Sequence, residues 1–167
     1  MELTAISSYC GTNIPGVLFI DYAPVEWINA AGWEGWTVAG NQPTDIPWKP
    51  GDYNWLRMPL IGQTIRWNET SNTTPNGKVY PQRLSGIIPN LRVDISDTIE
   101  ETERYERFIL RLRDRNNKVW IIGTPENPLT FTADAGTESG GGSEYAIEFA
   151  GEAIRRAKGF VPTITPS

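Results

Sequence analysis

The chain has no histidine and a single cysteine, Cys10. Because imidazole is missing, Ser-His-Asp and Cys-His catalysis, histidine metal sites and the usual general base near neutral pH are all excluded. A lone cysteine excludes an internal disulfide and a Cys-rich zinc site, and without a histidine partner we expect its thiol to be inert. These absences predict a protein that is not an enzyme and that holds no cofactor and no metal.

A signal peptide and a membrane-spanning segment are also missing from the sequence. The N-terminus has no charged segment followed by an apolar run, and no run of about 18 apolar residues is present to cross a bilayer. The net charge of −5 opposes binding to nucleic acid, since phosphates require a concentrated basic surface. We therefore expect a protein that is made in the cytoplasm and has no membrane partner.

Proline, glycine and aromatic residues are abundant. The 13 prolines and 16 glycines interrupt long helices, whereas the 7 tryptophans, 6 tyrosines and 5 phenylalanines favour sheet. A chain of 167 residues fits one domain, residues 1–167, that buries about 70% of its unfolded surface. We predict a mainly β protein, an antiparallel β-sandwich or partly closed barrel of about eight to ten strands with one short helix.

The central feature is a predicted β-hairpin over residues 104–123, with its turn at Asn116-Asn117. Apolar side chains recur at every second position of the first arm and arginines lie between them, with Ile109 as the one apolar exception. A two-faced ribbon of this length is expected to protrude from the subunit and pair with adjacent copies, leaving no free edge. The residues expected to form this assembly hairpin are Arg107, Phe108, Leu110, Leu112, Asn116, Asn117, Val119, Trp120 and Ile122.

Other elements follow from shorter patterns. Further strands are predicted at residues 16–22, 36–38, 53–58, 62–67, 90–95, 129–134 and 145–151. Asn76-Gly77 predicts a type I′ turn between strands at 65–69 and 78–84. The pattern of Asp97 followed by Glu100 predicts a capping box that begins a helix over residues 98–104.

A tryptophan- and proline-rich loop excursion occupies about residues 29–61. Tryptophans among amides and acids are typical of a glycan-binding platform, and the candidates for that alternative are Trp33, Trp36, Trp48 and Trp55. Rings of this kind more often fill a loop-rich layer or a subunit interface, because tryptophan combines a large apolar area with a polar N–H. We favour the second interpretation.

Charged residues are concentrated in two neighbouring segments. The acids Asp94, Asp97, Glu100, Glu101 and Glu103 form a run that a solvated helix face explains better than a metal site or a glycosidase carboxylate pair. The hairpin is basic, with Arg104, Arg107, Arg111, Arg113, Arg115 and Lys118. We expect these cations to pair with acids such as Asp94, Glu144 and Glu148, in the same chain or in a neighbouring copy, rather than with nucleic acid.

Five segments of the chain resemble small structural proteins of tailed phages and prophages, especially those of Bacteroidetes. They are Cys10–Val17, Ile20–Ile28, Arg107–Leu110, Asp114–Gly123 and Tyr145–Glu152. The resemblance is to proteins of the tail-tube type and covers about half of the chain, without the tryptophan-rich stretch.

This resemblance implies two packed antiparallel sheets with a flanking helix, in a subunit that forms rings, commonly hexameric. The rings would stack into the virion tail tube that conducts DNA during ejection, with other tail or neck proteins as further partners and DNA only as passing cargo. A head-to-tail connector or a tail-terminator protein would form rings in the same way. A carbohydrate- or receptor-binding tail component is the alternative of a different class.

Overall fold

The computed structural model describes residues 15–30, 46–137 and 142–159. Cys10, Trp33, Trp36 and the strand expected at 36–38 lie outside these residues. The described residues form two antiparallel sheets and the helix α2 (Val93–Glu103), together with the short 3₁₀ helices η1 (Val25–Trp27) and η3 (Gly62–Thr64). None of the described helices is long and apolar enough to cross a membrane.

The first sheet has the strand order β10-β7-β6-β1-β2. Its strands are β1 (Val17–Pro24), β2 (Leu56–Arg57), β6 (Phe108–Asp114), β7 (Val119–Ile122) and β10 (Lys158–Gly159). The second sheet has the order β3-β5-β9-β8, and β4 also pairs with β5. Its strands are β3 (Arg66–Glu69), β4 (Asn72–Thr74), β5 (Gly77–Pro89), β8 (Thr130–Thr137) and β9 (Ser143–Ala153).

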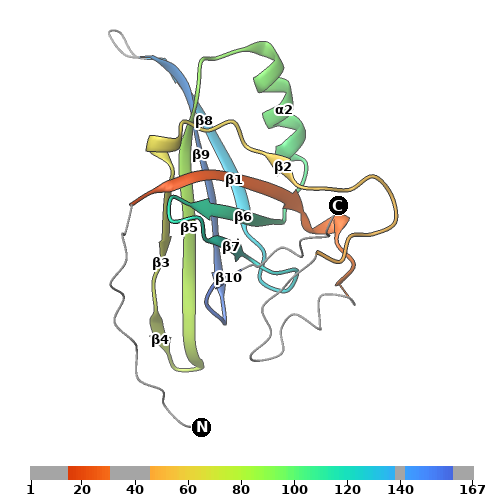
Figure 1. Cartoon of the computed structure of the whole chain (residues 1–167), viewed down its shortest axis with the longest axis vertical. Coiled ribbons are helices and arrows are strands. Elements are labelled where there is room, and N and C mark those ends of the chain that lie inside the picture. The colour runs from red at the N-terminus through yellow and green to blue at the C-terminus, as the bar shows by residue number, and fades with distance from the viewer. Residues whose placement is uncertain (1–14, 31–45, 138–141, 160–167) are drawn as a thin grey trace.

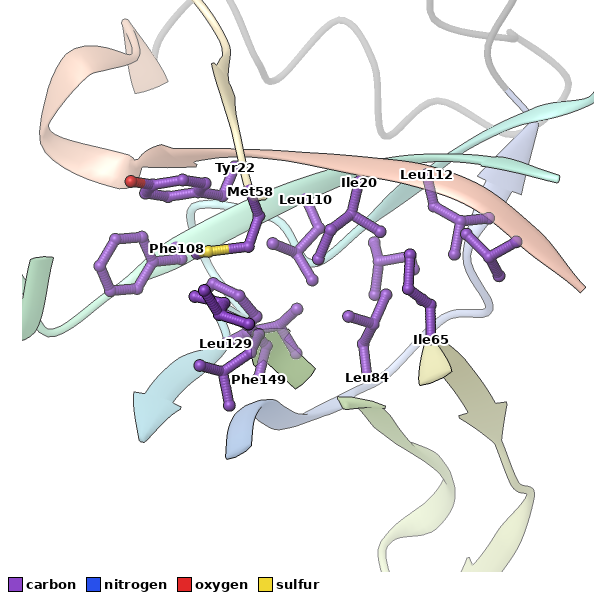
Figure 2. Close-up of a cluster of buried hydrophobic side chains, with 14 of the residues drawn as sticks. Ile20, Tyr22, Met58, Ile65, Leu84, Phe108, Leu110, Leu112, Leu129 and Phe149 are labelled. Atoms are coloured by element: carbon purple, nitrogen blue, oxygen red, sulfur yellow. The ribbon is translucent and has the colours of Figure 1, made fainter. Parts of the chain in front are cut away.

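The two sheets pack face to face, and the strands of the first run across those of the second (Figure 1). Neither sheet closes into a barrel, so the predicted antiparallel sandwich with one short helix is confirmed. The main core lies between the sheets, where Leu110 and Leu112 of β6 face Leu84 of β5 and Phe149 of β9 (Figure 2). Phe149 also packs edge to face on Phe108, with 5.6 Å between the ring centroids.

A second apolar cluster covers part of the outer face of the first sheet. Ile109 is fully buried there, together with Ala23, Val25, Ile28 and Ile121, under the side chains of Trp27, Ile46, Trp48, Trp55 and Val119. Ile109 breaks the alternation of apolar and charged residues in β6 because this strand is buried on both faces at that point.

The segment before the central hairpin differs from the sequence prediction. Residues 90–95 do not form a strand: β5 ends at Pro89, Asn90 adopts a left-handed conformation with φ 64°, and α2 begins at Val93. The helix therefore starts before the expected capping box at Asp97. The predicted alternation rested on too few residues, and Val93 is 79% exposed, whereas Ile95 and Ile99 repeat at helical spacing and pack on the core.

The turn between β4 and β5 also differs from the prediction. Pro75 and Asn76 occupy its two central positions, Thr74 pairs with Gly77, and of these residues only Gly77 has a positive φ, 123°. A type I′ turn needs positive φ at both central residues, which proline cannot adopt. The hairpin is present as expected, but its turn is of a different type.

Candidate functional site

The β6–β7 hairpin is confirmed, and the side chain of Asp114 shapes its turn. Asp114 Oδ1 accepts hydrogen bonds from the backbone N–H groups of Asn116, at 2.9 Å, and Lys118, at 2.8 Å. Asn117 has a left-handed conformation with φ 65°, which asparagine tolerates better than most residues, and its side-chain oxygen accepts a hydrogen bond from Arg113. The turn is therefore held by its own side chains.

The hairpin does not protrude, which corrects the expectation from the sequence. β6 lies between β1 and β7, and β7 pairs in turn with β10. Of the residues assigned to assembly, Phe108, Leu110, Leu112 and Ile122 are buried in the core. Val119 and Trp120 are half-buried against the two clusters. An alternating pattern identifies a two-faced ribbon, but it does not show which elements cover its faces and edges.

A buried acid organises the charged half of the outer face of the first sheet. The side chain of Asp21 is 3% exposed and pairs with both Arg57 and Arg111. Arg111 Nε and Nη2 donate to Asp21 Oδ2 at 3.0 and 2.6 Å, in side-on contact, and Arg57 Nε donates to Oδ1. Both carboxylate oxygens are thus used within the subunit.

Aromatic rings support the same guanidinium groups. Arg57 Cζ lies 3.6 Å from the ring centroid of Phe19, and Arg113 Cζ lies 6.0 Å from it. Arg111 Cζ lies 5.1 Å from the ring of Trp55. These cation–π contacts add to the ion pairs that Arg57 and Arg111 make with Asp21. The sequence pattern predicted the face of the hairpin arginines but not the acid that binds Arg111.

The charged residues of the hairpin pair with acids other than those expected. Arg107 pairs with Glu26 at 3.5 Å and Arg104 with Glu100 at 3.8 Å. Asp94 and Glu148, two of the expected partners, pair instead with Arg92 and Arg83. The hydrogen bond to Glu148 and its negative charge raise the pKa of the Arg83 guanidinium.

The acidic run occupies α2 and lies exposed to solvent, as the solvated-face interpretation predicts. Asp97, Glu101 and Glu103 make no ion pair within the described residues. The last turn of the helix contains no basic residue, although the carbonyl end of a helix favours cations. Over the described part of the chain, no group of three or more acidic or cysteine side chains is placed to hold a metal ion.

Trp48 and Trp55, the described members of the candidate glycan platform, are half-buried. Their rings meet edge to face at 5.5 Å, and both pack on the second apolar cluster. Trp27 stacks on Tyr53 at 5.4 Å. These tryptophans therefore form a layer over the sheet rather than a row of open ring faces.

The described surface includes a hollow beside α2 and another on the second sheet. The first, of about 230 Å³, opens between α2 and the sandwich, where Ile99 and Thr102 face Tyr22 and Met58, and Arg57 and Asp94 line its polar side. The second, of about 440 Å³, is a shallow polar depression on the outer face of the second sheet around Arg83 and Glu148. The first is smaller than a typical ligand pocket, and the second is open to solvent.

An open sheet edge is the feature that sequence reasoning missed. β8 pairs with β9 on one side, and beyond Leu129 no described strand pairs with its other side. The opposite edge of the sheet, formed by β3 and β4, is likewise paired only with β5 among the described strands. The sequence predicted the strand at 129–134, but the place of a strand in its sheet depends on distant segments of the chain.

Comparison of the chain with protein-family models, with curated proteins and with solved structures finds no match.

Proposed function

We propose that this protein is a virion structural subunit of the phage tail-tube type, whose copies join edge to edge into a ring that conducts DNA. The observation that supports this proposal is the edge of β8, whose outward backbone groups pair with no described strand beyond Leu129, although α2 contacts this strand. Natural proteins block exposed edges with lysine, proline, bulges or very short strands. β8 has eight residues, no lysine or proline and an unbroken register with β9, and its outer half is exposed.

The backbone bonds of Leu129 show which groups point outward from this edge. Leu129 N–H and C=O both bond to Phe108, each at 2.9 Å, so they point away from β9. Successive residues of a strand point their backbone N–H and C=O groups to alternate sides. Ala133 and Ala135 lie an even number of residues after Leu129, so their N–H and C=O groups also point away from β9. They have no backbone partner within the described residues and could bind a further strand.

The two edges of the second sheet are suited to pairing with each other. All its neighbouring strands are antiparallel, so β8 at one edge runs opposite to β3 at the other. A β8 strand placed beside β3 of the next copy would therefore continue the antiparallel order. The proposed ring contact pairs these two edges and replaces the central hairpin as the joining element.

The edges are also offset along the strand direction. Both β8 and β5 pair with β9, and the residues of β9 that pair with β8 also pair with Arg83–Pro89 of β5. On the other side, β3 and β4 pair with β5 between Gly77 and Ser85. A closed sheet needs tilted strands and a stagger of this kind. The geometry thus supports closure of the second sheets of several copies into one continuous barrel.

The test compares assembly of the wild type with that of Ala135→Pro. Proline removes one outward N–H without removing a bond to β9, so the subunit should fold normally but fail to assemble. Ala135→Ser keeps the N–H and is the matched control. Sedimentation velocity gives the oligomeric state, circular dichroism checks the fold, and electron microscopy shows whether rings form and stack.

Stacked rings from the wild type, lost in Ala135→Pro and kept in Ala135→Ser, support the tail-tube proposal. Single rings that do not stack favour a head-to-tail connector or a tail terminator, which share the same side-by-side contact. A wild type that stays monomeric at every concentration, or assembly unchanged by Ala135→Pro, contradicts the proposed contact.

A further inference from the structure

Two surfaces of opposite charge lie toward opposite ends of the first sheet. One is the basic turn, which we define as Arg113, Arg115 and Lys118 of the β6–β7 hairpin. The other is the acidic helix face, which we define as Asp97 and Glu101 of α2, four residues apart on one side of the helix. Within the described residues, none of these five side chains takes part in an ion pair, and all except Arg113 are exposed.

The two surfaces cannot neutralise each other within one subunit, because they are far apart. The basic turn lies at the start of β1, where Arg115 N–H donates to Gly16 C=O at 3.1 Å. The acidic helix lies toward the end of the same strand, where Thr102 Oγ1 contacts Tyr22 OH at 3.4 Å. Six residues of extended strand separate these points by about 20 Å, roughly twice the screening length at physiological salt.

The acidic helix face is itself unfavourable in the isolated subunit. Asp97 and Glu101 are four residues apart and therefore repel each other along one side of the helix. Glu101 lies in the last turn, where the helix dipole already carries negative charge. Cations from another molecule would relieve both effects.

We propose that the basic turn of one copy docks on the acidic helix face of the next. This inference rests on the proposed self-assembly and names a second contact besides the β8 edge. Surfaces at opposite ends of a subunit give a head-to-tail contact, which generates rings or stacks rather than a closed two-fold dimer. The alternative partner of a basic turn is nucleic acid, but the net charge of −5 opposes it, and only a second copy explains the acidic helix as well.

The test is a charge swap measured by sedimentation equilibrium in the full chain. Arg115→Glu/Lys118→Glu places acids opposite acids, and Asp97→Lys/Glu101→Lys places bases opposite bases. Each pair should weaken self-association at least about tenfold, since like charges meet at the contact, and the four changes together should restore most of it. Raising the salt concentration should weaken association of the wild type and of the swapped protein alike.

The matched control is Lys49→Glu/Lys78→Glu, which alters the net charge as much as Arg115→Glu/Lys118→Glu does. Both lysines are exposed and belong to neither surface. A tenfold loss in this control, or no recovery in the fourfold swap, overturns the inference. Unchanged self-association in Arg115→Glu/Lys118→Glu also overturns the inference. This holds even if that variant loses binding to random-sequence duplex DNA.

The β8 edge separates failure of this inference from failure of the proposed function. One possible outcome is that the wild type assembles, that Ala135→Pro abolishes assembly and that the charge-swap variants change nothing. In that case the head-to-tail docking is wrong and the ring proposal stands. If the wild type does not associate under any of these conditions, both proposals are wrong.

Discussion

Leu129 and Phe108 exchange both of their backbone hydrogen bonds, each at 2.9 Å, and join the start of β8 in one sheet to the start of β6 in the other. Both side chains are buried in the core between the sheets. This contact ties the edge that we propose for assembly to a largely buried strand in the middle of the other sheet. The orientation of the outward N–H groups of β8 is therefore set by the core and not by a mobile loop.

The first prediction concerns Gly151, which lets β9 pass close to this junction. A Cβ atom at Gly151 would lie 2.7 Å from Pro128 O and 2.8 Å from Leu129 Cδ2. Gly151→Ala should therefore push Leu129 out of place and destabilise the protein by about 1–3 kcal/mol, measured by urea denaturation. Gly136→Ala is the control, because nothing lies within 4 Å of a Cβ there. Equal stability of the two variants would contradict the close packing.

The second prediction concerns Asp21 and its two arginines. Asp21→Ala leaves the partly buried guanidinium of Arg111, which is 29% exposed, without its counter-charge. Loss of one partner from a fully buried pair costs about 3–5 kcal/mol, and partial exposure of both arginines reduces this to roughly 2 kcal/mol. The midpoint of chemical denaturation measures the effect. Asp52→Ala removes an exposed acid and should change stability little, so a similar loss in both variants would rule out a special role for Asp21.

The third prediction concerns the turn of the central hairpin. If the hairpin joined copies of the chain, as the sequence predicts, replacement of Asn116-Asn117 by Val-Val would impair assembly more than folding. The structure reverses this expectation, because β6 is a core strand and valine is strained at the left-handed φ of Asn117. Val-Val should lower the free energy of unfolding by about 1–2 kcal/mol for the left-handed residue alone. Asn117→Gly is the control, because glycine adopts this φ and the variant should fold normally. A thermal melt measures stability, and full stability of the Val-Val variant would show that the turn can change its conformation to accommodate valine.

Much of the fold was predictable because short local patterns carried it. Tyr145, Ile147 and Phe149 alternate with alanine and glutamate and are buried as their spacing predicts. The β6–β7 hairpin was equally clear from its two apolar arms. The helix was located less well, because only Ile95 and Ile99 mark its buried side and the start has no side-chain cap.

The candidate sites were less predictable, because they depend on contacts between distant residues. Asp21 and Arg111 are far apart in the sequence, and nothing near either residue indicates that they meet. Nor does the sequence show that β8 lies at an edge while β6 lies in the middle of its sheet. Alternation indicates which side chains of a strand face inward, but not the place of that strand in its sheet.

By itself, the sequence determined the β-rich class, the position of the central hairpin and the division of charge between an acidic helix and a basic turn. Each of these depends on residue type and on spacing over a few positions, which govern backbone preference and the side on which apolar groups lie. Only the tertiary structure decided which strands are covered and which edge stays open, because these follow from pairing between segments that are distant along the chain. The central hairpin is an interior element and β8 an outer one for that reason.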